Sequence, residues 1–438
     1  MKIEKCNSLV SGLISGNPLQ MPRRNMVIVP RKFYDLNSRA LLKRPILVAM
    51  NKGRTVFSQI MEFVSHDEFR RCVQRYEGNR GIRRLSCWDQ FLAMAFAQLT
   101  YRESLRDIEI CFAAHHKKLY HCGVSSPVKR STLADANERR DWRIYSDLAH
   151  SLIKVARPLY ADLELGIDLD ATVYALDSTT IDLCLSLFPW AKFRRAKGAI
   201  KLHTMMEVPS SIPVFIDITH GKTHDLKVLD VLVTEPGTFI VMDKGYTDFL
   251  RLYRLHRALV FFVTRAKHNM QFRRRRSRPV DKSTGLRSDQ SIVLTGPKSQ
   301  HLYPAPLRRV SYYSQEIDKH FVFLTNNFNV APLVIAELYK KRWQIELFFK
   351  WIKQHLRIKQ FFGTSINSVK TQVWISISVY VLISIIKRRL GIEHSIYTIL
   401  QVLSVSLFEK KPILSLFEHM DDIFHSIRVG NQLHLFEI

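Results

Sequence analysis

Three carboxylates occupy places from which a folded chain can bring them together. Asp177 directly follows the apolar run 173–176, and Asp243 has the same place after residues 239–242. Glu346 lies in a stretch whose other charged residues are all Lys or Arg. Carboxylate oxygens are the ligands that hard cations such as Mg²⁺ prefer, and two such ions can stabilise the attacking and leaving oxygens of a phosphodiester. The three acids therefore predict a metal site for phosphoryl transfer.

Each acid taken alone has a simpler explanation. An Asp beside a strand is often a turn or cap residue, and a helical Glu beside Lys or Arg is usually a surface pair worth under about 1 kcal/mol. Asp182 is an alternative to Asp177, but five residues further on it faces the other side of the strand. Asp248 is an alternative to Asp243 and is better explained as the N-cap of the next helix. We favour the three-acid site because these acids occur in a sensible order within a strongly basic chain.

The spacing around Glu346 predicts one polar stripe on a mostly buried helix. At 100° per residue, an arc of about 80° holds Tyr339, Arg342, Glu346, Lys350 and Lys353. Apolar residues cover the other sides of the helix. Arg binds phosphate through paired hydrogen bonds and Lys acts as a point charge, so the stripe fits a phosphodiester backbone held beside a metal ion.

The charge of the chain favours a polyanionic partner. Its 438 residues include 66 Lys and Arg but only 39 Asp and Glu, which gives a formal net charge of +27. Nucleic acid and an anionic membrane surface are the two candidates. The most apolar segment, 373–386, is shorter than the roughly 20 residues that a bilayer requires, so we interpret it as a buried helix and expect no membrane partner. Six cysteines without CxxC spacing favour a reducing, cytoplasmic location.

The apolar patterns predict an α/β fold that can position the acids. We expect strands, in chain order, at TVYALDSTTIDLCLS, AIKLHTMMEV, IPVFIDITHG, GTFIVMDKGY and LVFFVTRAK. We expect helices at HDLKVLDVLV, before the fourth strand, and at TDFLRLYRLHRA, before the fifth. Three strands in a row followed by alternating helices and strands indicate a mixed sheet flanked by helices.

The pattern also predicts four parts of the chain. We expect a basic irregular arm over 1–54, with Met50 as an alternative start, and a helical DNA-binding domain over 55–160. A catalytic domain over 165–390 is interrupted by a mostly β insertion at 268–320, and a helical segment follows over 391–438.

Further basic residues are candidates for DNA contacts. In the helical domain, one helix face is predicted to show Arg139, Arg140 and Arg143. An ordinary solvated amphipathic helix is the alternative for these three. The insertion begins with a basic, turn-rich loop that carries Arg273, Arg274, Arg275 and Arg276.

The motifs resemble those of bacterial insertion-sequence DDE transposases, specifically the insertion-sequence-four family. The spacing Tyr339-x2-Arg342-x3-Glu346-x6-Lys353 matches its YREK signature. LDSTTI is similar to its first-Asp motif, MDKGYTD to its second, and RSTLADANERRDW to the N-terminal region of one branch. The resemblance covers roughly residues 50–390.

The resemblance implies a ribonuclease-H-like catalytic fold with a β insertion between the second Asp and the Glu. It implies cut-and-paste transposition, in which water nicks double-stranded DNA at an element end and the freed 3′ hydroxyl attacks target DNA. Asp177, Asp243 and Glu346 would bind two Mg²⁺ or Mn²⁺ ions, and the remaining YREK residues would contact DNA. By analogy we expect a homodimer that pairs two element ends, in a nucleoid-associated bacterial protein. Another metal-dependent nuclease or recombinase, and a DNA-binding protein without catalysis, are the alternatives.

One departure concerns hairpin formation at the element end. Family members that form a hairpin stack a flipped base on a Trp of the insertion, whereas this chain has no Trp between 244 and 338. The aromatic residues that could replace it by stacking are Tyr303, Tyr312, Tyr313, Phe321 and Phe323.

Overall fold

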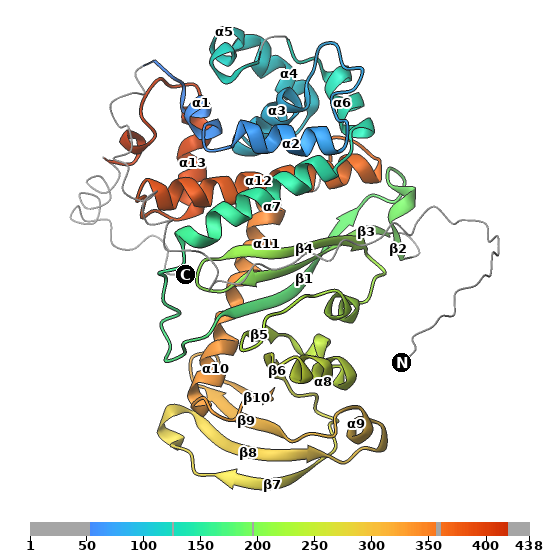
Figure 1. The fold of residues 1–438 in the computed structure, drawn as a ribbon, viewed down its shortest axis with the longest axis vertical. Coiled ribbons are helices and arrows are strands. Elements are labelled where there is room, and N and C mark those ends of the chain that lie inside the picture. Colours follow the sequence, from blue (N-terminus) through green and yellow to red (C-terminus); the bar gives the residue numbers. More distant parts are fainter. Residues whose placement is uncertain (1–52, 125–126, 195–196, 356–360, 419–438) are drawn as a thin grey trace, which may run out of the picture.

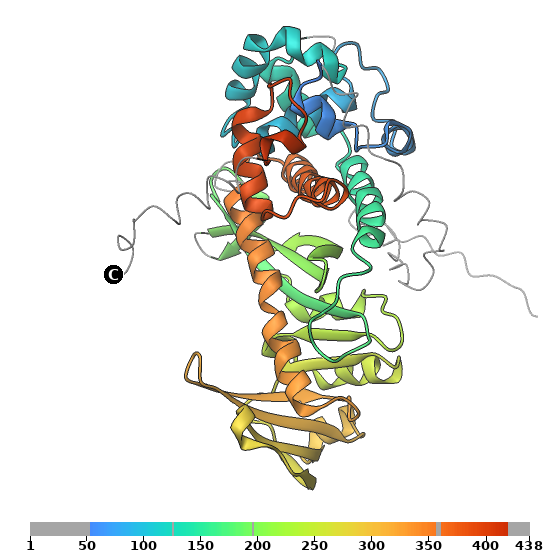
Figure 2. The ribbon, with the colours of Figure 1, turned by 90° about the vertical axis from the view of Figure 1, so that its left-hand side faces the viewer.

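The computed structural model describes residues 53–124, 127–194, 197–355 and 361–418 (Figure 1). The predicted arm lies outside this part of the chain except for residues 53 and 54, and so do residues 419–438 of the predicted C-terminal segment. Helices occupy one end of the elongated molecule, a mixed sheet lies in the middle, and the strands of the insertion form the other end (Figures 1 and 2).

The helical end combines the N-terminal helices with two helices from the end of the chain. The first group is α1 (Val56–Met61), α2 (His66–Arg75), α3 (Cys87–Leu99), α4 (Leu105–Ala114), α5 (His116–Leu119), α6 (Arg130–Arg139) and α7 (Arg143–Leu159), with the 3₁₀ turn η3 (Tyr120–Cys122). The second group is α12 (Ile366–Arg389) and α13 (Ile396–Ser406), with η8 (Leu414–Leu416). Serine side chains cap several of these helices, and Ser86 and Ser104 form full capping boxes with acids three residues on.

Helix α12 forms the centre of the helical end and packs against α7. Among the described helices it alone is long and apolar enough to cross a membrane by length and composition, yet 94% of its most apolar 18-residue window is buried inside the fold. The prediction that 373–386 belongs to a buried helix is therefore confirmed.

The central sheet has the mixed topology that the sequence predicted. Its strands are β1 (Val173–Leu183), β2 (Lys192–Arg194), β3 (Lys197–Glu207), β4 (Ile212–His220), β5 (Phe239–Met242) and β6 (Phe261–Arg265). Strand β3 pairs antiparallel with β1, β2 and β4, whereas β1, β5 and β6 run parallel to one another. The order β4-β3-β1-β5-β6 is that of a ribonuclease-H-like sheet.

Alternation along β1 separates two cores. Val173 and Ala175 belong to the larger core, shared with the long helices, while Tyr174 and Leu176 belong to the smaller core shared with α8 (Phe249–Arg257). Because side chains alternate along a strand, Asp177 continues the face of Val173 and Ala175.

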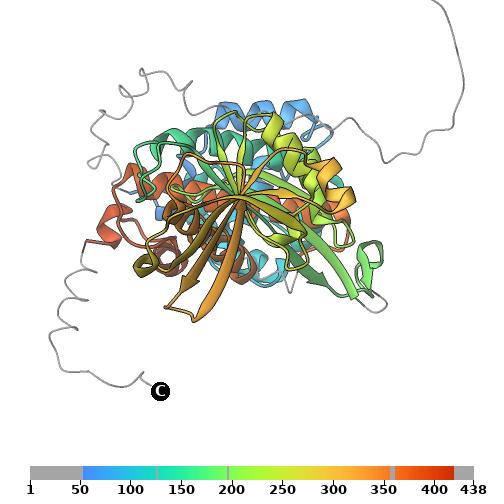
Figure 3. The same ribbon diagram turned by 90° about the horizontal axis from the view of Figure 1, so that it is seen from below.

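The insertion extends the same sheet instead of forming a separate one. Beyond β6 the order continues with β10 (Lys319–Thr325), β9 (Leu307–Ser314), β8 (Leu286–Leu294) and β7 (Phe272–Arg278), and short helices η7 (Lys282–Thr284) and α9 (Pro297–Leu302) connect these strands. Figure 3 shows this end of the molecule nearest the viewer. The prediction of a turn-rich loop is wrong for β7, because the arginine run forms the outer strand of the sheet and pairs with β8. An outer strand exposed on both faces accommodates charge at every position.

Two helix predictions are also corrected. HDLKVLDVLV forms only the 3₁₀ helix η5 (Asp225–Asp230), because its β-branched valines disfavour a helix and Pro236 follows closely. Arg139 ends α6 and Arg143 begins α7, with Arg140 between them, so these three arginines do not share one helix face.

The helix that carries Glu346 is interrupted at one residue. Arg342 lies between α10 (Pro332–Lys341) and α11 (Trp343–His355), so the expected single helix is two. Its backbone keeps the helical αR conformation, and the two helices run nearly end to end from the insertion strands to the helical end (Figure 2).

Candidate active site

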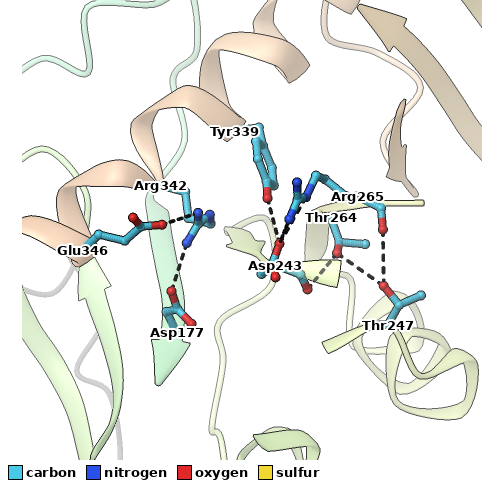
Figure 4. A network of polar contacts seen from close by, with 8 residues as sticks. All are labelled: Asp177, Asp243, Thr247, Thr264, Arg265, Tyr339, Arg342 and Glu346. Atoms are coloured by element: carbon cyan, nitrogen blue, oxygen red, sulfur yellow. Dashed lines mark hydrogen bonds and ion pairs between the residues drawn. The ribbon is translucent and has the colours of Figure 1, made fainter. Parts of the chain in front are cut away.

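The parallel pairing of β1 and β5 brings the first two acids together. Leu176 and Met242 are register partners, and Asp177 and Asp243 are the next residues along the chain. Asp243 therefore follows the carboxyl end of β5, and Asp177 lies level with it inside β1, where the parallel β1–β5 pairing stops. Open α/β sheets bind ligands beyond such strand ends. Glu346 approaches from the first turn of α11, which packs against β1 (Figure 4).

Arg342 joins the first and third acids. Its Nη1 donates to Asp177 Oδ2 at 2.9 Å, and its Nη2 donates to Glu346 Oε1 (Figure 4). The Arg342 side chain is only 13% exposed, so this guanidinium is held inside the site. A single cationic group thus bridges Asp177 and Glu346.

Asp243 has its own partners. Its Oδ1 accepts hydrogen bonds from Arg265 Nε at 3.1 Å, Arg265 Nη2 at 2.7 Å and the Tyr339 hydroxyl at 3.0 Å. Sequence reasoning missed Arg265. The signal was available, because Arg265 ends the strand that follows β5 and lies two residues beyond the Val241–Val263 register pair, level with Asp243.

The two aspartates have different electrostatic environments. Burial raises the pKa of Asp177 to about 6, although the Ser178 amide and the Arg342 guanidinium oppose this rise. Burial also acts to raise the pKa of Asp243, but the hydrogen bonds and charge of Arg265, the Lys244 amide and the Tyr339 hydroxyl together outweigh it and hold that pKa below its usual value. Burial raises the pKa of Tyr339 to about 12, so its hydroxyl stays protonated and donates to Asp243.

The donor set of the site fits a hard divalent cation. Three carboxylates supply oxygen ligands, and Asp177 and Glu346 already share one positive group. Within the described part of the chain, no three Asp, Glu, His or Cys side chains are grouped closely enough to hold an ion as they stand. The guanidinium of Arg342 lies between two of the acids, so an ion shared by these acids would require Arg342 to move.

The remaining predicted basic residues lie elsewhere. Lys350 and Lys353 are exposed on α11, further along the helix that carries Glu346. The outer strand β7, at the edge of the insertion, contains the exposed arginines Arg273, Arg274, Arg275 and Arg276.

The three arginines around the α6–α7 turn belong to the helical end, away from the acids (Figure 1). Arg139 is exposed and pairs with Asp135. Arg143 pairs with Asp141. Arg140 points inward and donates to Gln90 and to the backbone of residues 85 and 86, so its donors serve the fold.

The five aromatic residues that were candidates for base stacking divide into two groups. Tyr303 is 1% exposed and its hydroxyl contacts His256, while Phe323 is 2% exposed and packs against Tyr339. The partly exposed residues, which have surface available for stacking, are Tyr312, Tyr313 and Phe321.

Comparison with known proteins places the chain in a family. Residues 168–382 match the transposase DDE domain, and residues 52–125 match a domain of unknown function. A protein of Sinorhizobium fredii that is named as a transposase, y4zB, is 32% identical over 294 residues, which cover 66% of this chain and 80% of that protein. A protein of Geobacillus stearothermophilus, named as a transposase for the insertion sequence element IS5377, is 29% identical over 48% of this chain and 55% of its own length.

Two further similarities extend the comparison. A protein of Synechocystis, named as a transposase for the element IS4SA, is 25% identical over 58% of this chain and 71% of its own length. Among solved structures, a piggyBac transposase synaptic complex with hairpin DNA aligns with a TM-score of 0.43 at 10% identity, over 88% of this chain and 86% of that one. The domain match and the Sinorhizobium relative together show that the chain belongs to the DDE transposases.

Proposed function

We propose that this chain moves an insertion sequence by cut-and-paste transposition, as a YREK-type transposase of the insertion-sequence-four family. One observation carries the proposal: Tyr339 of α10, Glu346 of α11 and Arg342 between these helices meet Asp177 and Asp243 on two neighbouring parallel strands. These are the residues that the motif spacing singled out, although they lie far apart in the sequence.

Asp177, Asp243 and Glu346 are the proposed metal ligands. Two bound Mg²⁺ or Mn²⁺ ions would supply Lewis-acid stabilisation of the charge that develops on the phosphodiester oxygens. The chain itself supplies the positioning. Arg342 has a planar pair of donors that can bind a phosphate as well as a carboxylate, and Tyr339 and Arg265 hold Asp243 in place.

Double-stranded DNA is the proposed partner. Lys350 and Lys353 continue the stripe from Glu346 along the exposed side of α11, where they can contact the backbone beside the scissile phosphate. The arginines of β7, residues 273–276, form a second exposed basic row on the insertion. Two element ends must be held together for transposition, which favours a homodimer.

The test is cleavage and strand transfer on a plasmid that carries the DNA flanking this gene. Wild type should cut at the element ends and join them to target DNA only with Mg²⁺ or Mn²⁺, and Asp177→Asn, Asp243→Asn and Glu346→Gln should each abolish both steps while retaining DNA binding. The matched control is Asp182→Asn, which removes an exposed acid from the same strand as Asp177 and should remain active.

Each contrary outcome would indicate a different function for this chain or a different set of site residues. Cleavage without joining would make this chain a nuclease. If the wild type bound DNA but did not cleave it, the chain would be a DNA-binding protein without catalytic activity. Near-normal cleavage by any one acid variant would exclude that acid from the site.

A further inference from the structure

A second polar cluster lies directly behind Asp177, on the opposite face of the sheet. Side chains alternate along β1, so Ser178 points away from the candidate active site. Its register partner on β3 is His203, and Lys201 lies two residues earlier on that strand. Asp225, at the start of η5, completes the cluster by contacting Ser178 on this face of the sheet.

Asp225 Oδ1 is the atom that the other three side chains of this cluster share. Ser178 Oγ donates to Asp225 Oδ1 at 2.6 Å, and the same oxygen lies 3.1 Å from Lys201 Nζ and 3.7 Å from His203 Nδ1. Lys201 Nζ also donates to the carbonyl of Thr223 at 3.0 Å, which ties the loop before η5 to β3. Asp225 is therefore fixed relative to both strands and can in turn hold the Ser178 hydroxyl.

Ser178 connects this cluster to the first acid. Its backbone N–H donates to Asp177 Oδ1 at 2.8 Å, which leaves Asp177 Oδ2 to face Arg342. The same residue thus orients the Asp177 carboxylate through its backbone and is itself anchored to Asp225 through its side chain.

The cluster also reaches the second acid. Helix η5 packs against η6 (Lys244–Tyr246), which directly follows Asp243. Tyr246 is 2% exposed and faces the cluster; burial, and then the charge of Asp177, raise the pKa of its phenol. Movement of η5 would therefore be transmitted to the residues that follow both aspartates.

We propose that Asp225 is a positioning residue that acts through Ser178 to orient Asp177 and to fix its spacing from Asp243. The inference rests on the proposed function, because it assumes that both aspartates are metal ligands. Partners that orient metal ligands typically contribute 10–100-fold in metal affinity, so loss of this link should weaken metal binding by about that factor.

The experiment measures Mn²⁺ binding to the full-length protein by electron paramagnetic resonance of the free ion, with and without element-end DNA. Ser178→Ala and Asp225→Asn should weaken Mn²⁺ binding about 10–100-fold. Ser178→Thr, which keeps the hydroxyl, should restore binding. The matched control Asp230→Asn removes another acid of η5, one that pairs with Arg251 at the surface, and should bind Mn²⁺ as the wild type does.

The outcomes separate the inference from the function on which it rests. Circular dichroism and DNA binding in EDTA identify variants that fail to fold; if Asp225→Asn is one of them, the Ser178→Ala and Ser178→Thr pair decides. Equal weakening by Ser178→Thr and Ser178→Ala, or wild-type affinity in folded Asp225→Asn, would overturn the positioning role while leaving the function intact. A wild type that binds no Mn²⁺, with or without DNA, would overturn the proposed function and this inference with it.

Discussion

Replacing Asp177 with Asn should make the metal-free protein more stable at neutral pH. The Asp177 side chain is 20% exposed, and burial raises its pKa from 3.8 to about 6. The folded state therefore holds the proton more tightly than the unfolded state does. The cost of the charged carboxylate is absent below about pH 4, grows as the pH rises from about 4 to 6, and is complete above that range.

The magnitude follows from the shift. One pKa unit corresponds to about 1.4 kcal/mol, so a rise of roughly two units costs the wild type about 3 kcal/mol at pH 7.5 and about half of that at pH 5. Asn has the same shape without the charge and avoids this cost. Arg342 keeps its bond to Glu346 in the variant, so it is not left without a carboxylate partner.

The assay is equilibrium urea denaturation in EDTA at pH 7.5 and pH 5.0, followed by circular dichroism. Asp177→Asn should raise the free energy of unfolding at pH 7.5, and the gain should shrink at pH 5.0. The exposed control Asp182→Asn should change stability little at either pH. A destabilised Asp177→Asn protein at pH 7.5, or a gain that does not depend on pH, would refute the reasoning.

Three other predictions concern charges outside the carboxylates of the site. Arg342→Gln should tighten Mn²⁺ binding by the DNA-free protein, because the guanidinium no longer competes for Asp177 and Glu346; weaker binding, measured by electron paramagnetic resonance, would contradict this. Replacing the four arginines 273–276 with Gln should reduce the slope of log binding constant against log salt by up to about 3.6, at about 0.9 per phosphate contact, and an unchanged slope would exclude β7 from the interface. Asp289→Asn should lower the free energy of unfolding, measured by urea denaturation, by about 3–5 kcal/mol. The variant leaves the buried Arg308 without the carboxylate that accepts two of its hydrogen bonds, each 2.9 Å long. A loss under about 1 kcal/mol would show that the guanidinium finds other partners.

The sequence predicts much of the fold because the sheet strands have local signatures. β1 and β5 each contain an apolar run that an Asp directly follows, and this pattern identifies the two acids. It does not show that β1 continues past Asp177 to Leu183, whereas β5 ends at Met242. The outer strand β7 has no such signature, because an edge strand exposed on both faces does not need alternating apolar residues. η5 was misassigned because a short amphipathic segment looks helical until the valines and the nearby proline are weighed.

The partners of the acids are harder to predict than the acids. Arg265 reaches Asp243 through strand pairing, and Asp225 reaches Ser178, behind Asp177, through loop packing. Neither residue has a motif spacing that points to it. The bond of Arg342 to Asp177 joins residues 165 positions apart and is set by how α10 and α11 lie across the sheet. Such contacts depend on register and packing, which local sequence patterns do not encode.

Iron-directed cleavage of the protein tests whether Asp177, Asp243 and Glu346 bind one metal centre. Fe²⁺ replaces Mg²⁺ on the full-length protein with element-end DNA, and ascorbate with peroxide then generates radicals that cut the backbone near the bound ion. We expect cuts close to all three acids, which excess Mg²⁺ should suppress and which Glu346→Gln should abolish. Cuts that cluster elsewhere, or that persist unchanged in Glu346→Gln, would contradict a shared metal centre.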